Sequence, residues 1–143
     1  MADRYAIVVA RFYADLADRL VASARRTFES DGAHEIDIFD VPGAFELPLA
    51  ALYAADSGRY RAIACLGAII RGETDHYDYV CTECARGIQD VQLRTGVPCA
   101  FGVLTVESMD QALERAGGRK RDHGAQAAHA AITLARLREQ LGA

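Results

Sequence analysis

The sequence has no apolar run that approaches the roughly 18 residues of a membrane-spanning helix. It also has no excess of positive charge, since 16 Lys and Arg residues face 20 Asp and Glu residues and the formal net charge is −4. Nucleic acid is therefore a poor candidate partner. The first residues lack the basic start and small-residue cleavage site of a signal peptide, so we expect a cytoplasmic protein without membrane or nucleic-acid partners.

Cysteine is scarce, and its four positions do not follow a disulfide or zinc pattern. Cys65 and Cys99 fall in apolar, strand-like runs, whereas Cys81 and Cys84 fall inside a predicted helix. Redox Cys-x-x-Cys pairs sit at the start of a helix, and a structural zinc site needs converging ligands. We predict buried, reduced thiols and no metal. A redox protein that uses Cys81 and Cys84 is a less favoured alternative.

The chain has the length and composition of one globular domain, which we predict to span residues 1–143. No repeat or low-complexity linker interrupts it. Strand-like runs are predicted at Tyr5–Ala10, Glu35–Phe39, Ala62–Ile70 and Pro98–Leu104. Helical patterns alternate with them, at Asp15–Ser30, His76–Ile88, residues 108–115 and about Gly124–Leu141. This alternation predicts an α/β fold with right-handed crossovers around a parallel sheet.

The segment Ala44–Ala55 is apolar almost all round, although a helix that covers one side of a sheet needs only an apolar stripe. We expect part of it to pack against another subunit. A purely intramolecular core is the alternative.

A buried strand meets a helix through a polar turn in residues 67–80. The first N–H groups of a helix lack intrahelical partners and favour an anion such as phosphate. Gly72 allows close approach of the backbone, the Thr74 hydroxyl can donate, and a histidine such as His76 suits proton transfer near neutral pH. The turn is therefore a candidate anion site beside a titratable base. An ordinary capped helix start with a surface histidine is the alternative.

Five motifs occur in a fixed order: Ala10-Arg11-Phe12, residues 41–48 (VPGAFELP), residues 67–80, residues 101–105 and residues 114–117. Together they cover nearly the whole chain and resemble the 6,7-dimethyl-8-ribityllumazine synthase family, the penultimate enzymes of riboflavin biosynthesis. The resemblance implies a flavodoxin-like three-layer sandwich with a four-stranded parallel sheet flanked by helices. It implies a transferase that condenses 5-amino-6-(D-ribitylamino)uracil with L-3,4-dihydroxy-2-butanone 4-phosphate, releasing phosphate and water, without metal or cofactor.

The resemblance also assigns site residues at the carboxyl ends of the strands. His76 matches the proposed acid–base residue of the family. The other matched positions bind the two small-molecule substrates: Phe12, Ala44, Phe45, Glu46, Ala68, Ile69, Ile70, Glu73, Thr74, Phe101 and Arg115.

Within this set, Phe12 is expected to stack on the pyrimidine, residues 44–46 to hold the ribityl chain, and residues 68–70 to contact the edge of the uracil. Glu73 and Thr74 match the phosphate-binding turn. In the family, Phe101 and Arg115 reach the site from the adjacent subunit.

Departures from the family pattern concern His123, where many relatives carry a lysine, and Tyr13, where a small polar residue is common. The chain also begins a few residues before its first strand, whereas many relatives have an extra segment that pairs with a neighbouring sheet. The resemblance implies a homopentamer, and for some relatives a 60-subunit icosahedral shell. A non-catalytic flavin- or lumazine-binding module of the same fold is the main alternative.

Overall fold

The computed structural model of the chain describes residues 4–33, 35–72, 76–118 and 121–143. Strands pair in parallel in the order β2-β1-β3-β4, so β2 and β4 form the edges of one sheet. The strands are β1 (Arg4–Ala10), β2 (Glu35–Val41), β3 (Ala62–Ile70) and β4 (Cys99–Val106).

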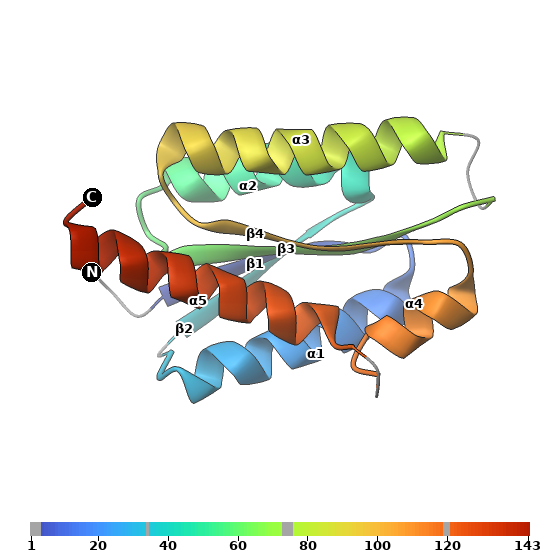
Figure 1. The fold of residues 1–143 in the computed structure, drawn as a ribbon, viewed down its shortest axis with the longest axis horizontal. Coiled ribbons are helices and arrows are strands. Elements are labelled where there is room, and N and C mark those ends of the chain that lie inside the picture. The colour runs from blue at the N-terminus through green and yellow to red at the C-terminus, as the bar shows by residue number, and fades with distance from the viewer. Residues whose placement is uncertain (1–3, 34, 73–75, 119–120) are drawn as a thin grey trace.

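Helices cover both faces of the sheet, as Figure 1 shows. The α-helices are α1 (Ala14–Ser30), α2 (Leu47–Asp56), α3 (Tyr77–Thr95), α4 (Met109–Arg115) and α5 (His123–Leu141), and a short 3-10 helix, η1 (Ala44–Glu46), precedes α2. The helices α2 and α3 lie on one face, and α1, α4 and α5 lie on the other (Figure 1). The predicted three-layer α/β sandwich with a four-stranded parallel sheet is confirmed.

The sheet separates two apolar core clusters. Alternate residues of β1 point to opposite faces, so Tyr5 packs with α1 and α5 while Val8 packs with α2 and α3. Every residue of β3 is buried, as expected for a central parallel strand covered on both faces. The ring of Tyr5 stacks on that of Phe28, with 4.3 Å between the centroids.

Element boundaries differ from the predicted ones where tertiary pairing or a cap decides them. β2 continues to Val41 because Asp40 and Val41 pair with Val9 and Ala10 of β1, although aspartate has a poor strand propensity. The helix α3 continues to Thr95 and ends at Gly96, whose φ of +73° is left-handed.

The apolar segment around α2 is only partly covered by its own chain. Leu47 and Ala51 of α2 are buried, whereas Phe45, Leu49 and Tyr53 are exposed. The segment therefore does not form a purely intramolecular core. Its packing against another subunit stays a prediction.

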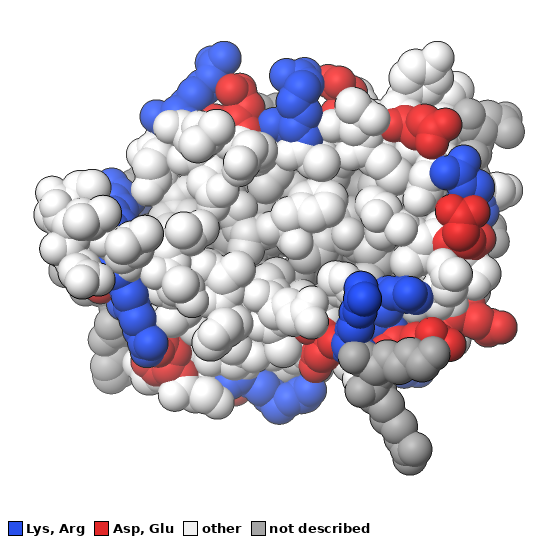
Figure 2. Space-filling model, viewed as in Figure 1, with Lys and Arg blue, Asp and Glu red and all other residues white. Residues whose placement is uncertain are grey.

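The face of the molecule along the β4 edge is hollowed, and charged side chains lie mostly around the rim of this hollow. β4 has no strand partner on its outer side in the described sheet, and Phe101 and Thr105 on it are exposed. In the view of Figure 1, β4 runs across the front of the sheet. Figure 2 shows the same face with uncharged atoms in its hollowed centre and charged side chains mostly around its rim.

The four cysteines are free thiols, and Cys65, Cys84 and Cys99 are buried as predicted, whereas Cys81 is only partly buried, which corrects the prediction for that residue. Burial raises the pKa of Cys84 and of Cys99 to about 12, which disfavours the reactive thiolate. The described residues include no group of three or more His, Cys, Asp or Glu side chains placed to hold a metal. None of the described helices is long and apolar enough to cross a membrane.

Gly124 marks the closest approach of α5 to α1. A Cβ atom at this position would lie 2.3 Å from the carbonyl oxygen of Leu20, which is backbone and cannot rotate away. We expect Gly124→Ala to lower the free energy of unfolding by about 2 kcal/mol, because the two helices must separate. Thermal melting followed by circular dichroism measures the loss.

Ala130→Ser, on the exposed face of the same helix, is the matched control and is expected to change stability by less than about 0.5 kcal/mol. Equal melting temperatures for Gly124→Ala and the natural chain would contradict the tight contact.

Candidate active site

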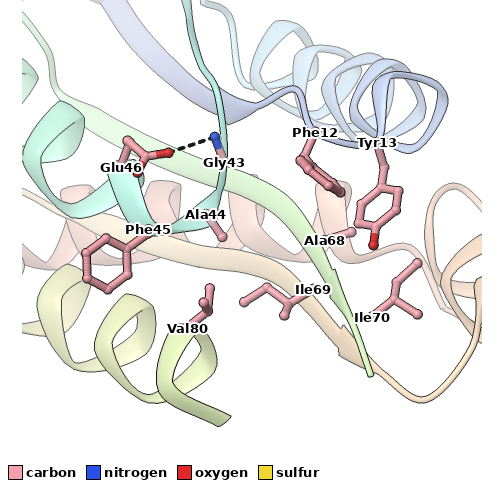
Figure 3. A pocket seen from close by; sticks show the side chains of 10 residues that line it. All are labelled: Phe12, Tyr13, Gly43, Ala44, Phe45, Glu46, Ala68, Ile69, Ile70 and Val80. Carbon is pink, nitrogen blue, oxygen red and sulfur yellow. Dashed lines mark hydrogen bonds between the residues drawn. The ribbon is translucent and has the colours of Figure 1, made fainter. Parts of the chain in front are cut away.

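A pocket lies at the carboxyl edge of the sheet, where the segments after β1, β2 and β3 converge (Figure 3). Open parallel sheets bind ligands at this edge. The pocket brings together seven of the residues assigned from the sequence: Phe12, Ala44, Phe45, Glu46, Ala68, Ile69 and Ile70. Tyr13, Gly43 and Val80 complete its lining.

Phe12 is an exposed aromatic side chain beside this pocket rather than a core phenylalanine. It is 69% exposed, and its ring meets that of Tyr13 edge to face, with 4.9 Å between the centroids. Figure 3 places the two rings side by side, across the pocket from Phe45. A flat ring that is available in this way can stack on a heteroaromatic ligand.

Arg11 fixes the segment that presents Phe12. Its Nε donates to Asp40 at 2.8 Å, and its Nη1 donates to Asp18 at 2.5 Å. These bonds join the end of β1 to β2 and α1, and the hydrogen bond that Arg11 donates to Asp40 is the main cause that raises the pKa of Arg11. The motif Ala10-Arg11-Phe12 does not reveal this role of Arg11, because the residues that its side chain binds lie 7 and 29 positions away in the sequence.

Glu46 braces the turn that enters η1. Its carboxylate accepts the backbone N–H of Gly43 at 2.9 Å, the bond drawn dashed in Figure 3. The charge on this apolar turn therefore has the polar partner that a carboxylate needs there. The bond also fixes the backbone at Ala44 and Phe45, which line the pocket.

His76 lies just before α3, as its N-cap residue, and is not the first helical residue that the predicted helix His76–Ile88 makes it. Its φ of −111° and ψ of 24° are not helical, and its carbonyl accepts the N–H of Val80 at 2.9 Å. Val80 lines the first pocket, and His76 precedes Val80 by one helical turn. The His76 ring lies 6.4 Å from that of Tyr79, centroid to centroid. Glu73 and Thr74 lie outside the described residues.

Phe101 and Arg115 belong to a second pocket, along the β4 edge. The pocket is lined by β4 residues and by Gln111, Arg115, Arg121 and His123. Arg115 donates through Nη1 to the carbonyl of Gln111 at 3.0 Å, which uses one of the several N–H donors of the guanidinium. The structure thus places nine of the predicted site residues in two pockets of one chain, seven in the first and two in the second, whereas His76 is in the lining of neither.

His123 begins α5 within this second pocket. Its Nδ1 is buried and has no hydrogen-bond partner in the part of the chain that the structure describes. Burial lowers the pKa of His123, and the charges of Arg121 and Arg115 act in the same direction. The side chain is therefore mainly neutral at pH 7, unlike a lysine at this position, which would be a permanent cation.

Comparison with known proteins agrees with the geometry. The family model of 6,7-dimethyl-8-ribityllumazine synthase matches residues 2–139 of the chain. A 6,7-dimethyl-8-ribityllumazine synthase from Halorhodospira halophila is 46% identical over 142 residues, which covers 98% of this chain and 91% of that protein.

Proposed function

The chain belongs to the 6,7-dimethyl-8-ribityllumazine synthase family, and from that premise we infer that it is a transferase of riboflavin biosynthesis. It condenses 5-amino-6-(D-ribitylamino)uracil with L-3,4-dihydroxy-2-butanone 4-phosphate to 6,7-dimethyl-8-ribityllumazine, releasing phosphate and water. The structural observation that carries this conclusion is the first pocket, which joins the exposed ring of Phe12 to the ends of three parallel strands.

The first pocket is the proposed site of the pyrimidine. Its chemistry supports this assignment, because its lining is mainly apolar and aromatic and includes the backbone at the end of β3. Phe12 stacks on the uracil ring, and residues 68–70 bond to the edge of the ring through their backbone. Residues 44–46, held in place by the bond from Gly43 to Glu46, bind the ribityl chain.

The phosphorylated butanone needs a cation that the described lining of the first pocket does not contain, since its charged residue is Glu46. We assign its phosphate to the segment that contains Glu73 and Thr74 and to Arg115 of a neighbouring protomer. The second pocket supports this arrangement, because it holds Arg115 and Arg121 beside the exposed ring of Phe101. One protomer supplies the pyrimidine half of each site, and its neighbour supplies the cationic half.

This division requires a homo-oligomer, and we propose a pentamer, with a 60-subunit icosahedral shell as the larger alternative. The exposed apolar side chains Phe45, Leu49 and Tyr53 support a subunit contact beside the first pocket. A cytoplasmic location stays a prediction.

The alternatives from the sequence are less well supported. A binding module without turnover has no observation in its favour beyond His123 and Tyr13, and family membership favours the enzyme. A redox role for Cys81 and Cys84 is disfavoured because both lie inside α3 and burial is the main cause that raises the pKa of each thiol.

The reaction itself is directly testable. Purified protein with both substrates is expected to form the lumazine chromophore and inorganic phosphate in equal amounts, and either substrate alone to give none beyond the uncatalysed rate. Absorbance and a phosphate assay on the same sample measure the two products. Tight binding of riboflavin without turnover would instead identify the binding module.

A further inference from the structure

Arg71, the first residue after β3, contacts the segments on either side of the candidate site. Its backbone N–H donates to the carbonyl of Val106 at 2.9 Å, and its Nε donates to Glu107 at 3.0 Å. Its Nη2 lies 3.7 Å from the carboxylate of Asp78, and its Cζ lies 4.3 Å from the centroid of the Tyr77 ring. One side chain therefore joins the end of β4 to the first turn of α3.

The contacts on α3 lie directly beside the candidate acid–base residue. His76 precedes Tyr77 and Asp78 in the chain, so a guanidinium that stacks on Tyr77 and attracts Asp78 restrains the backbone at His76. At the other end of the segment, Gly72 has a φ of +85°, a left-handed conformation that leads the chain away from β3. Arg71 thus bridges the segment between β3 and α3.

The anchor on the other side is itself held. The N–H of Glu107 donates to the side-chain oxygen of Gln111 at 2.8 Å, and the N–H of Gln111 donates to the hydroxyl of Ser108 at 3.2 Å. These bonds cap the start of α4, the helix that ends at Arg115. The backbone of Glu107, whose carboxylate accepts from Arg71, is therefore held by the cap of α4.

Stability alone does not explain this arrangement. The Arg71 side chain is 50% exposed and its carboxylate partners are more so, and exposed ion pairs contribute little to folding. Other exposed pairs on α3, such as Arg94 with Asp90, join residues of the same helix. Arg71 joins separate elements, with the planar fork and stacking that arginine provides and lysine does not.

We propose that Arg71 is a positioning residue that holds His76 in place for proton transfer, by tying the first turn of α3 to Glu107. The inference rests on the proposed function, in which His76 moves protons. Catalysis is sensitive to such placement, since a displacement of about 1 Å can cost as much as 10²-fold in rate.

The test compares Arg71→Gln with Arg94→Gln, a matched loss of an exposed arginine from a pair near the far end of α3. We expect Arg71→Gln to lower kcat about 10-fold, with the KM for the pyrimidine and the melting temperature close to those of the natural chain. Arg71→Lys keeps the positive charge but not the planar guanidinium, and we expect it to lower kcat about 3-fold. Arg94→Gln is expected to change none of these quantities.

A double variant tests the anchor. If Arg71 acts through Glu107, the variant Arg71→Gln/Glu107→Gln has the same kcat as Arg71→Gln, because the second substitution removes a contact already lost. A kcat of the double variant that is clearly lower than that of Arg71→Gln would overturn the proposed anchor. An unchanged kcat in Arg71→Gln, or a loss accompanied by a large fall in melting temperature, would overturn the positioning role.

Hydrogen exchange gives a readout that does not depend on turnover. The amide of Val80 donates to the carbonyl of His76 and reports on the first turn of α3. We expect this amide to exchange faster in Arg71→Gln and at the natural rate in Arg94→Gln. If the natural protein makes no lumazine, the proposed function fails, while the Val80 exchange rate still decides whether Arg71 holds the turn. Unchanged exchange would overturn the proposal.

Discussion

Replacing Arg115 with alanine is expected to raise the KM for the phosphorylated butanone by about 10- to 100-fold, because charge-assisted hydrogen bonds to its phosphate are lost. The bond from Nη1 to Gln111 occupies only part of the guanidinium, so further donors remain for an anion. We expect kcat and the KM for the pyrimidine to change little, since the same contact stabilises ground and transition states. Steady-state kinetics with each substrate varied in turn measures all three quantities.

Arg138→Ala provides the control, because this arginine lies in the last turn of α5 and bonds to the backbone of Ala143. It is expected to leave the kinetics unchanged. A raised KM in Arg121→Ala combined with a normal KM in Arg115→Ala would move the phosphate contact to the other arginine of the second pocket.

Replacing His76 with glutamine is expected to lower kcat by about 10²- to 10⁴-fold, the usual contribution of a general acid–base group. Activity above the uncatalysed rate remains, because both substrates are still held together. We expect the KM values to change by less than about 3-fold, since the lost proton transfers belong to the transition states. Steady-state rates of lumazine formation over a range of pH values measure the effect.

His129→Gln is the matched substitution, because His129 is an exposed histidine on α5, outside both pockets. It is expected to retain the kcat of the natural chain. A normal kcat with a strongly raised KM in His76→Gln would make His76 a binding residue and transfer the proton chemistry to another group.

Much of the fold could be predicted from the sequence because its signals are local. The uninterrupted apolar run of β3 predicts a central parallel strand, and the structure gives it the predicted bounds, Ala62–Ile70. The serine and glutamine three residues apart at Ser108 and Gln111 are typical of a capping box, and the Ser108 hydroxyl accepts the N–H of Gln111. The reciprocal bond differs, since the side chain of Gln111 accepts from Glu107 rather than from Ser108.

Other features could not be predicted because they depend on residues far apart in the chain. Arg71 and Glu107 are separated by 36 residues, and no local pattern pairs them. The pKa of His123 falls chiefly because its ring is partly buried, a property of how α5 begins rather than of its neighbours in sequence. The resemblance supplied the residues of the site, while only the coordinates divide them between two pockets.

The separation of the two pockets has a consequence for a single copy of the chain. A protomer alone would keep its own core, because both apolar clusters are internal to it. On the proposed assignment it would nevertheless carry one half of each of two different active sites and no complete one. Catalytic activity would therefore arise only when identical copies assemble, because each copy completes an active site of its neighbour.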